Sequence, residues 1–499
     1  MKKIVIIFIC IPVIAFSQLQ TAKIFASNMV LQRDKQIHIW GKGIPEKTVV
    51  ASFSGEQKMT LINADSSWDI YFRKQKANSN PQSISIISEN KKIELQNILI
   101  GDIWLCIGQS NMEFPMKREM HFNDEIHEAN QPLIKLYNPW FVGKYFGSEA
   151  FSASMNKKMN ACDFYQGTWQ NCDSISVKEM SAVGYYFAKS IVVNKKNPIG
   201  IINLAIGGAP IESFISKETL SNNKQFAEKL KANWLTNNAL SVWARKRAKE
   251  NIGDAIDLLS DDIGPNHAFK PCFAYEAGIL PIIELPIKGV LLYQGESNAQ
   301  EIDRVNEYVD LQKLMIDDYR KKWNDPTMPF YWVQLSSMDT LNYKSLFWPE
   351  FRNEQRKLLS VIHNSGMAVS SDVGFIHNVH PTNKKIVGER LARWALNKTY
   401  HTNIVPSGPL PFHAKYKNGK IVITFQYAGN DLHSSDAKLL RGFSIDGVNE
   451  CKANINKKKV VIVVNEKPAF VYYGWKPFTE ANLVNSALLP ASTFKIKVN

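Results

Sequence analysis

The strongest constraint on the fold of this chain is a change of rhythm near Asp102. Beyond that residue, apolar runs of strand length alternate with segments whose apolar residues recur at helical spacing. This alternation is typical of βαβ units, in which helices pack on a parallel sheet. It predicts an α/β domain over residues 101–400, with strands at 103–107, 199–204, 290–293, 330–335 and 367–369.

Two helical segments of this domain stand out. Val387, Leu391, Trp394 and Ala395 fall largely at helical spacing and predict its last helix. Residues from about 215 to 265 are rich in Lys, Glu, Asn and Ala, which predicts a helical insertion. Because it would lie near the strand ends, this insertion could form a wall of a substrate cleft.

Short alternating strands predict a β domain on each side of the α/β domain. Over residues 18–100 turn residues separate the strands, and every second residue over 68–72 is apolar. Over residues 401–499 the strand rhythm returns, and Asn418-Gly419 between two apolar runs indicates a hairpin. Both segments are therefore predicted to form β-sandwich-like domains.

Residues 1–17 have the layout of a secretory signal peptide. Lys2 and Lys3 precede an apolar run over 4–15, and cleavage is expected near Ser17. A run of about 12 apolar residues is too short to cross a bilayer, which needs about 20. We therefore predict an exported protein, periplasmic or extracellular, with no membrane span.

Charge and cysteine content exclude several classes of protein. The formal net charge is +14, but the lysines are scattered without a basic stripe, so no nucleic-acid partner is predicted. The six cysteines are spread too thinly for a zinc site or a disulfide scaffold, although Cys162 and Cys172 could pair across a loop. We predict no metal and no organic cofactor, and we leave the oligomeric state open.

A serine directly after the first apolar run is suited to nucleophilic catalysis. Gly108-Gln109-Ser110-Asn111-Met112 follows the strand predicted to end at residue 107. A tight turn, which Gly108 permits, can hold the Ser110 hydroxyl outward, while the N–H groups of the next helix face a developing oxyanion. The same pattern fits a serine that only caps the helix.

Two further polar segments follow strand-length runs. The backbone at Gly207-Gly208 can approach a ligand closely, and the Gly208 N–H could donate to an oxyanion, although an ordinary loop glycine fits as well. In Tyr-Gln-Gly-Glu-Ser-Asn over 293–298, Asn298 offers an amide donor, while Gln294 and Glu296 could position substrate or catalytic groups. A turn built around Asn298 is the structural alternative.

A histidine before the last helix is a candidate general base. His380 closes the segment His377-Asn378-Val379-His380. An ordinary imidazole pKa near 6.5 lets it accept a serine proton and return it to a leaving oxygen at neutral pH. The alternatives are a surface histidine and a metal site with His377, but no third carboxylate or cysteine lies nearby in the sequence to complete such a site.

These four blocks, in this order and each after a strand, resemble the SGNH hydrolases, and the surrounding segments resemble the sialate O-acetylesterase family. Most of the chain after the predicted leader takes part. The further segments that carry the resemblance are 25–33 (Phe-Ala-Ser-Asn-Met-Val-Leu-Gln-Arg), 40–41 (Trp-Gly), 101–104 (Gly-Asp-Ile-Trp), 181–187 (Ser-Ala-Val-Gly-Tyr-Tyr-Phe), 348–350 (Trp-Pro-Glu), 380–381 (His-Pro) and 489–492 (Leu-Pro-Ala-Ser).

The resemblance implies a fold, a reaction and a set of roles. The fold would be an SGNH-like parallel-sheet domain between two β-sandwich-like domains. The reaction would be removal of O-acetyl groups from a sugar, most often a sialic acid, or in some relatives xylan or another plant glycan. The implied roles are nucleophile for Ser110, base for His380, and oxyanion-hole donors for Ser110, Gly208 and Asn298. As separate candidates, Gln109 and Gln294 are expected to contact the substrate.

One departure from the family pattern concerns the group that orients the base. Many members carry an aspartate two or three positions before the histidine, where this chain has Asn378 and His377. Asn378 could orient the imidazole but could not stabilise its charged form. Asp372 or Glu296 could supply a carboxylate if folding brings either close.

The missing aspartate leaves a second functional interpretation open. It is a carbohydrate-binding protein on a degenerate esterase scaffold. A lipase would need an apolar lid, and the insertion over about 215–265 is too polar for one.

Overall fold

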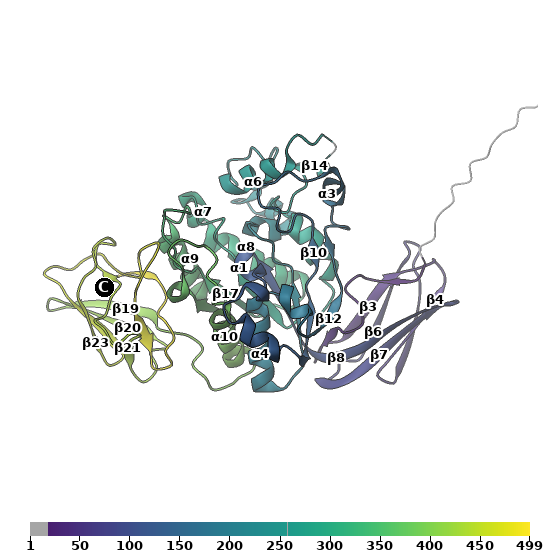
Figure 1. The fold of residues 1–499 in the computed structure, drawn as a ribbon, viewed down its shortest axis with the longest axis horizontal. Coiled ribbons are helices and arrows are strands. Elements are labelled where there is room, and N and C mark those ends of the chain that lie inside the picture. Colours follow the sequence, from purple (N-terminus) through teal and green to yellow (C-terminus); the bar gives the residue numbers. More distant parts are fainter. Residues whose placement is uncertain (1–17, 257) are drawn as a thin grey trace, which may run out of the picture.

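The computed structural model describes residues 18–256 and 258–499. The signal peptide predicted over residues 1–17 therefore lies outside the described residues. Three parts follow one another along the long axis of the molecule (Figure 1). Strands from the first part of the chain form one end, a mixed α/β part lies in the middle, and strands from the last part form the other end.

A mostly parallel sheet forms the middle of the molecule. Strand β12 pairs antiparallel with β9, and the strands that follow pair in parallel. All five apolar runs that predicted strands are strands. The order across the sheet is β12 (Trp169–Cys172), β9 (Gln131–Tyr137), β13 (Ile199–Asn203), β8 (Lys91–Gly108), β16 (Gly289–Tyr293), β17 (Phe330–Gln334) and β18 (Ser365–Val369).

Strand β9 is absent from the sequence-based prediction. Its segment contains Pro132 and Lys135, which interrupt the apolar run that marks the other strands. Lys135 is nevertheless buried, and its ammonium group donates to Asn171 of the neighbouring β12 at 2.6 Å. A polar side chain can occupy an inner strand once the fold supplies its partner, and that partner is not visible in the local pattern.

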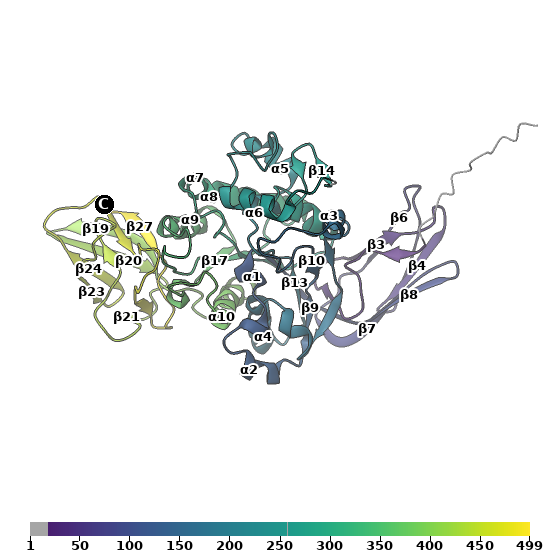
Figure 2. The same cartoon turned by 45° about the horizontal axis from the view of Figure 1, so that its top comes forward.

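Long helices cover both faces of this sheet (Figure 2). In the part of the chain that the structure describes, no helix is long and apolar enough to cross a bilayer. The last helix predicted from the sequence is α10. The main helices are α4 (Ala182–Lys195), α8 (Tyr308–Lys322), α9 (Trp348–Val361) and α10 (Lys384–Trp394). Helix α4 packs on α10, and α8 packs on α9.

One long strand, β8, belongs to both the N-terminal and the central sheets. Its first half pairs with β7 (Asn78–Ser88) and β2 (Val30–Gln32), and its second half pairs with β13 and β16. Asp102 in the middle of β8 is fully buried and accepts hydrogen bonds from Gln32, Arg33 and Tyr400. These bonds hold the N-terminal strands against the central part.

Two local β-structure predictions are confirmed. Trp68, Ile70 and Phe72 on β6 (Ser67–Phe72) are buried on one face, as their alternation predicts. The pair Asn418–Gly419 forms the turn between the antiparallel strands β19 (Leu410–Lys417) and β20 (Lys420–Gln426).

The C-terminal strands have their own hydrophobic core and are joined to the central part by a buried arginine. Arg352 of α9 is fully buried, and its guanidinium group donates to the carbonyl oxygens of Gly474, Lys476 and Pro477. Three carbonyl oxygens of the C-terminal part thereby accept hydrogen bonds from a side chain of the central part.

Cys162 and Cys172 do not form the disulfide that their spacing allows. Cys162 is exposed, Cys172 is buried, and both are free thiols. The Cys172 sulfur instead faces the carbonyl oxygen of Ala129 at 3.4 Å.

Candidate active site

A turn at the end of β8 presents Ser110 at the carboxyl edge of the central sheet. Gly108 ends the strand with φ of +126°, and Ser110 begins the short helix α1 (Ser110–Glu113). A Cβ added at Gly108 would lie 2.1 Å from the carbonyl oxygen of Tyr293 on the adjacent β16. Close packing of two strand ends therefore requires glycine at this position.

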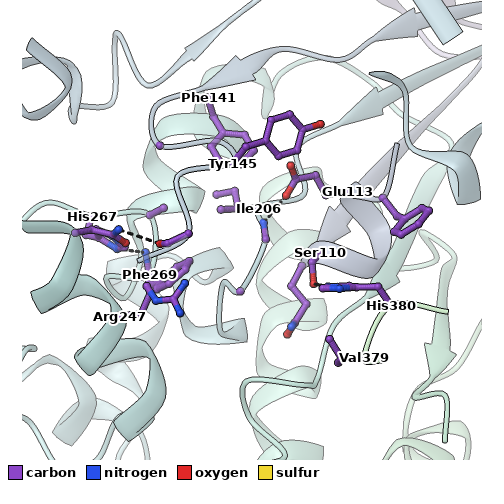
Figure 3. A pocket seen from close by; sticks show the side chains of 18 of the residues that line it. Ser110, Glu113, Phe141, Tyr145, Ile206, Arg247, His267, Phe269, Val379 and His380 are labelled. Atoms are coloured by element: carbon purple, nitrogen blue, oxygen red, sulfur yellow. Dashed lines mark hydrogen bonds between the residues drawn. The ribbon is translucent and has the colours of Figure 1, made fainter. Parts of the chain in front are cut away.

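The structure places His380 directly against Ser110. The Nε2 atom of His380 lies 2.7 Å from the Ser110 Oγ, although the two residues are 270 positions apart in the chain (Figure 3). This is hydrogen-bond distance, the geometry that proton transfer from hydroxyl to imidazole requires.

The environment of His380 favours its neutral form. Burial and, to a smaller extent, the nearby positive charges of Lys384 and Arg118 together lower the pKa of the imidazole from 6.5 to about 4. Above that pH the ring is uncharged. It can therefore accept a proton from Ser110 at neutral pH.

This pKa predicts the acid limb of the pH profile. We expect kcat/KM to rise with pH through a midpoint near 4 and not near 6.5, because only the neutral imidazole accepts the serine proton. Replacing Arg118 by glutamine should move the midpoint upward, since one positive charge near the ring is lost. Initial rates of p-nitrophenyl acetate hydrolysis in acidic and neutral buffers test this. A wild-type midpoint at or above 6.5 contradicts it.

Both carboxylates predicted as possible orienters of His380 have other hydrogen-bond partners. Both oxygens of Asp372 accept hydrogen bonds from the Arg390 guanidinium group at 2.7 Å. Glu296 accepts from the side-chain amide of Asn111 at 2.5 Å. Among the described residues, neither acid forms a hydrogen bond with the His380 ring. The expectation that one of them completes a triad is therefore not met in this structure.

The segment before His380 also differs from the expectation. The Asn378 side-chain oxygen accepts from the backbone N–H of His380 at 2.8 Å, so it holds the main chain and not the ring. His377 turns away and pairs with Asp339 at 2.7 Å. His377 and His380 thus have separate partners, Asp339 and Ser110, and do not face a common metal position.

The two proposed oxyanion-hole donors beyond Ser110 lie in different surroundings. Gly208 lines the cavity in front of Ser110. Asn298 is fully buried, with its Nδ2 donating to Glu212 at 2.9 Å and its Oδ1 accepting from Gln294 at 2.7 Å. The structure thus brings Gly208 to the cavity and uses the Asn298 amide in an internal network.

The two glutamines predicted to contact substrate also have internal partners. The Gln109 side-chain oxygen accepts from the backbone N–H groups of Gly295 and Ser297, both at 3.3 Å. Gln294 is buried and accepts from the hydroxyl of Tyr308 at 2.6 Å. Gln109 nevertheless borders the cavity, whereas Gln294 donates to the Gln109 side-chain oxygen and to the Ala209 carbonyl oxygen.

A cavity of about 420 Å³ opens in front of Ser110 and His380 (Figure 3). Its wall combines aromatic faces with charged groups. Part of this wall comes from α6 (Val242–Ile252), within the insertion predicted over about 215–265. Besides His380, the aromatic and charged lining residues are Glu113, Phe114, Arg118, Phe141, Tyr145, Phe151, Trp243, Arg247, His267, Phe269 and Tyr343.

Several of these residues were missed by the sequence analysis. Trp243 and Arg247 are four residues apart in α6, so they share one helix face, but nothing in the local pattern says that this face lines a cavity. Glu113 lies one helical turn after Ser110 and accepts from the backbone N–H of Gly207 at 2.6 Å. Burial raises the Glu113 pKa to about 7.

Part of the chain that carries this site matches a known family of esterases. Residues 277–397 match the family described as "carbohydrate esterase, sialic acid-specific acetylesterase". The chain is a carbohydrate esterase similar to the sialate O-acetylesterases. The matched segment carries Glu296, Asn298 and His380, while Ser110 lies outside it.

Full-length similarity extends well beyond that segment. This esterase is 25% identical to the sialate O-acetylesterase of Mus musculus over 80% of its own length and 77% of the relative. It is 26% identical to the Homo sapiens enzyme of the same name, over 77% of its own length and 72% of the relative. Among solved structures, a carbohydrate acetylesterase from Xanthomonas citri aligns with a TM-score of 0.78 at 27% identity, covering 96% of this chain and 99% of that one.

Proposed function

We propose that this esterase removes acetyl groups from sugar hydroxyls, with O-acetylated sialic acids as its substrates, through an acetyl-enzyme on Ser110. The observation that carries the mechanism is the 2.7 Å contact between Ser110 Oγ and a neutral His380 Nε2 at the floor of the cavity. The sugar O-deacetylation itself follows from the similarity to sialate O-acetylesterases.

The reaction proceeds in two acyl transfers. Ser110 Oγ attacks the acetyl carbonyl carbon while His380 takes the hydroxyl proton, and the Ser110 and Gly208 N–H groups stabilise the negative oxygen. The C–O bond to the sugar then breaks, and His380 returns its proton to the sugar oxygen. Water, deprotonated by His380, then attacks the acetyl carbon, the bond from that carbon to Ser110 Oγ breaks, and His380 returns the proton to Oγ as acetate leaves.

The charges in the cavity favour an acidic sugar over a neutral plant glycan. Arg118 and Arg247 line the cavity, and the nearby carboxyl group of Glu113 has a pKa raised to about 7, so its negative charge is reduced at neutral pH. Sialic acids carry a carboxylate. A guanidinium group can bind a carboxylate through two parallel hydrogen bonds.

A substrate panel tests the function. Acetate release should be fast on O-acetylated sialosides and slow on acetylated xylan, and mass spectrometry of a quenched reaction should find the acetyl group on Ser110. Faster release from xylan would reassign the substrate to plant glycans. Binding of the glycans without acetate release from any substrate would support a binding protein and overturn the proposal.

Arginine variants test the choice of sugar. Replacing Arg118 or Arg247 by glutamine should raise KM for an acetylated sialoside about tenfold, because a charge-assisted hydrogen bond contributes about 1.5 to 3 kcal/mol. Turnover of acetylated xylan should not change. Lys246→Gln is the matched control for the Arg247 variant. It removes a positive charge from the same helix, α6, at a residue that does not line the cavity. Equal loss on both substrates would contradict a carboxylate contact.

We also propose that the protein is exported to the periplasm or the extracellular space. The basis is the leader-like sequence of residues 1–17. Fractionation of cells that express the chain with and without these residues tests this. Equal cytoplasmic retention of both forms would contradict export.

A further inference from the structure

A buried chain of polar side chains links the loop of the nucleophile to the loop of the base. Lys384 Nζ donates to the side-chain oxygen of Asn111 at 2.5 Å. The Asn111 amide nitrogen donates in turn to Glu296 at 2.5 Å and to the carbonyl oxygen of Val379 at 3.0 Å. Lys384 and Asn111 are completely buried and Glu296 is 1% exposed, so these contacts replace water entirely.

The position of Asn111 in the chain places it next to the nucleophile and in contact with the segment of the base. Asn111 directly follows Ser110, and its amide binds the carbonyl of Val379, which directly precedes His380. One side chain therefore connects the backbone next to the nucleophile with the backbone next to the base. Lys384, at the start of α10, and Glu296, after β16, hold it from opposite ends.

The partners of the Asn111 amide allow only one orientation. Its oxygen faces an ammonium group, and its NH₂ faces a carboxylate and a carbonyl oxygen. Rotating the amide by half a turn would set NH₂ against the ammonium and oxygen against two acceptors. Buried contacts of that kind are strongly unfavourable, so the amide is fixed in the observed orientation.

This link accounts for the orientation of a base that lacks the usual carboxylate. In a triad, an acid binds the second ring nitrogen of the histidine and fixes its direction. Here the described hydrogen bonds hold the peptide group between Val379 and His380. The Val379 carbonyl oxygen accepts from the Asn111 amide, and the His380 backbone N–H donates to the Asn378 side-chain oxygen. The ring itself contacts Ser110 and packs beside Phe114.

We propose that Asn111, held by Lys384 and Glu296, is the positioning residue for His380 and takes over the aligning role of the missing triad carboxylate through the backbone of Val379. This inference rests on the proposed serine mechanism. It assigns to the asparagine a task separate from chemistry, since Asn111 touches neither the reacting hydroxyl nor the imidazole ring in the contacts described.

The charges at the two ends of the link are balanced across Asn111. Burial lowers the pKa of Lys384 to about 7 and raises the pKa of Glu296 to about 7, and each group opposes the shift of the other. Glu119 also faces Lys384 and favours its charged form, whereas Arg118 disfavours it. The positive charge of Lys384 in turn helps to keep His380 neutral.

The test compares a single variant with a double variant that repairs its electrostatics. Asn111→Asp sets a carboxylate against Glu296 and against the Val379 carbonyl, and should destabilise the protein and lower kcat. In Asn111→Asp/Glu296→Gln the new carboxylate accepts from both Lys384 and the new amide, so stability should recover. The Val379 carbonyl still lacks its donor. We therefore expect kcat to stay about 100-fold below wild type, with KM within a few-fold, because small misplacements of a catalytic group have effects of that size.

A matched control separates positioning from folding. Asn485 is also completely buried, and its amide donates to the carbonyl oxygens of Ser407 and Tyr427 in the C-terminal part, away from the cavity. Asn485→Asp should lose stability with kcat unchanged. If the double variant regains wild-type kcat together with stability, Asn111 serves folding alone and the inference is overturned.

A third variant covers the case in which the position-111 variants do not fold. Lys384→Met removes the donor that fixes the Asn111 oxygen and also one positive charge near His380. Both a lower kcat and an upward shift of the acid midpoint are expected, and an unchanged kcat and midpoint would overturn the inference. Loss of activity in Ser110→Ala together with wild-type kcat in these variants would reject the positioning role and leave the serine mechanism intact.

Discussion

Replacing Ser110 by alanine is expected to lower kcat by about four to six orders of magnitude while leaving the fold intact. The magnitude is that seen when the nucleophile of a serine hydrolase is removed. The physical reason is that no acetyl-enzyme can form once the Oγ atom, 2.7 Å from His380, is absent. The small Cβ of alanine fits the same turn, so stability should be preserved. Acetate release from an O-acetylated sialoside measures the effect.

A buried serine near the site provides the control for this variant. The Ser213 hydroxyl is buried and donates to the carbonyl oxygen of Pro210, so Ser213→Ala removes a hydroxyl without touching the nucleophile. We expect its kcat to stay within a few-fold of wild type. If Ser110→Ala retained wild-type turnover, the serine mechanism would be wrong.

Replacing Gly108 by alanine is expected to lower the free energy of unfolding by at least about 4 kcal/mol, a loss typical only of severe steric or electrostatic damage. The added Cβ would meet the Tyr293 carbonyl oxygen at 2.1 Å, and φ of +126° is unfavourable for any residue with a side chain. The contact is backbone against Cβ, so no side-chain rotation relieves it. The Ser110 turn should move and activity should be lost with stability.

A second glycine that lines the same cavity separates the cost of a positive φ from the cost of a steric clash of the added Cβ. Gly147 also has a positive φ, +59°, but a Cβ added there would have no atom within 4 Å. Gly147→Ala should therefore cost only about 1 to 2 kcal/mol, the cost of a left-handed conformation. Urea unfolding of both variants and wild type measures the difference. Similar losses in the two variants would mean that the strand-end contact at Gly108 is unimportant.

The strand predictions succeeded where a run of apolar residues has no polar interruption. β13 and β16 are uniformly buried, and their sequences show it directly. β9 was missed because its buried Lys135 depends on Asn171, which is 36 positions later in the chain. A local periodic pattern predicts a buried strand only when the buried residues are themselves apolar.

The site predictions divide in the same way. Ser110 and His380 were singled out from local motifs, a hydroxyl after a strand and an imidazole before a helix, although each motif alone also fits a helix cap or a surface histidine. Their contact, and the diversion of Asp372 to Arg390, depend on the approach of separate loops. The sequence likewise could not predict that one face of α6 lines the cavity, since helical spacing shows which residues share a face but not what that face contacts.

The sequence by itself determined which residues carry reactive groups and where strands end, because both depend on residue type and on neighbours within a few positions. Only the tertiary structure decided what each group binds. It sent the Asn298 amide to Glu212, left the His380 ring without a carboxylate partner among the described residues, and placed Asn111 between Lys384 and Val379. Hydrogen bonds act over about 3 Å in space, and the chain brings their partners together from hundreds of positions apart.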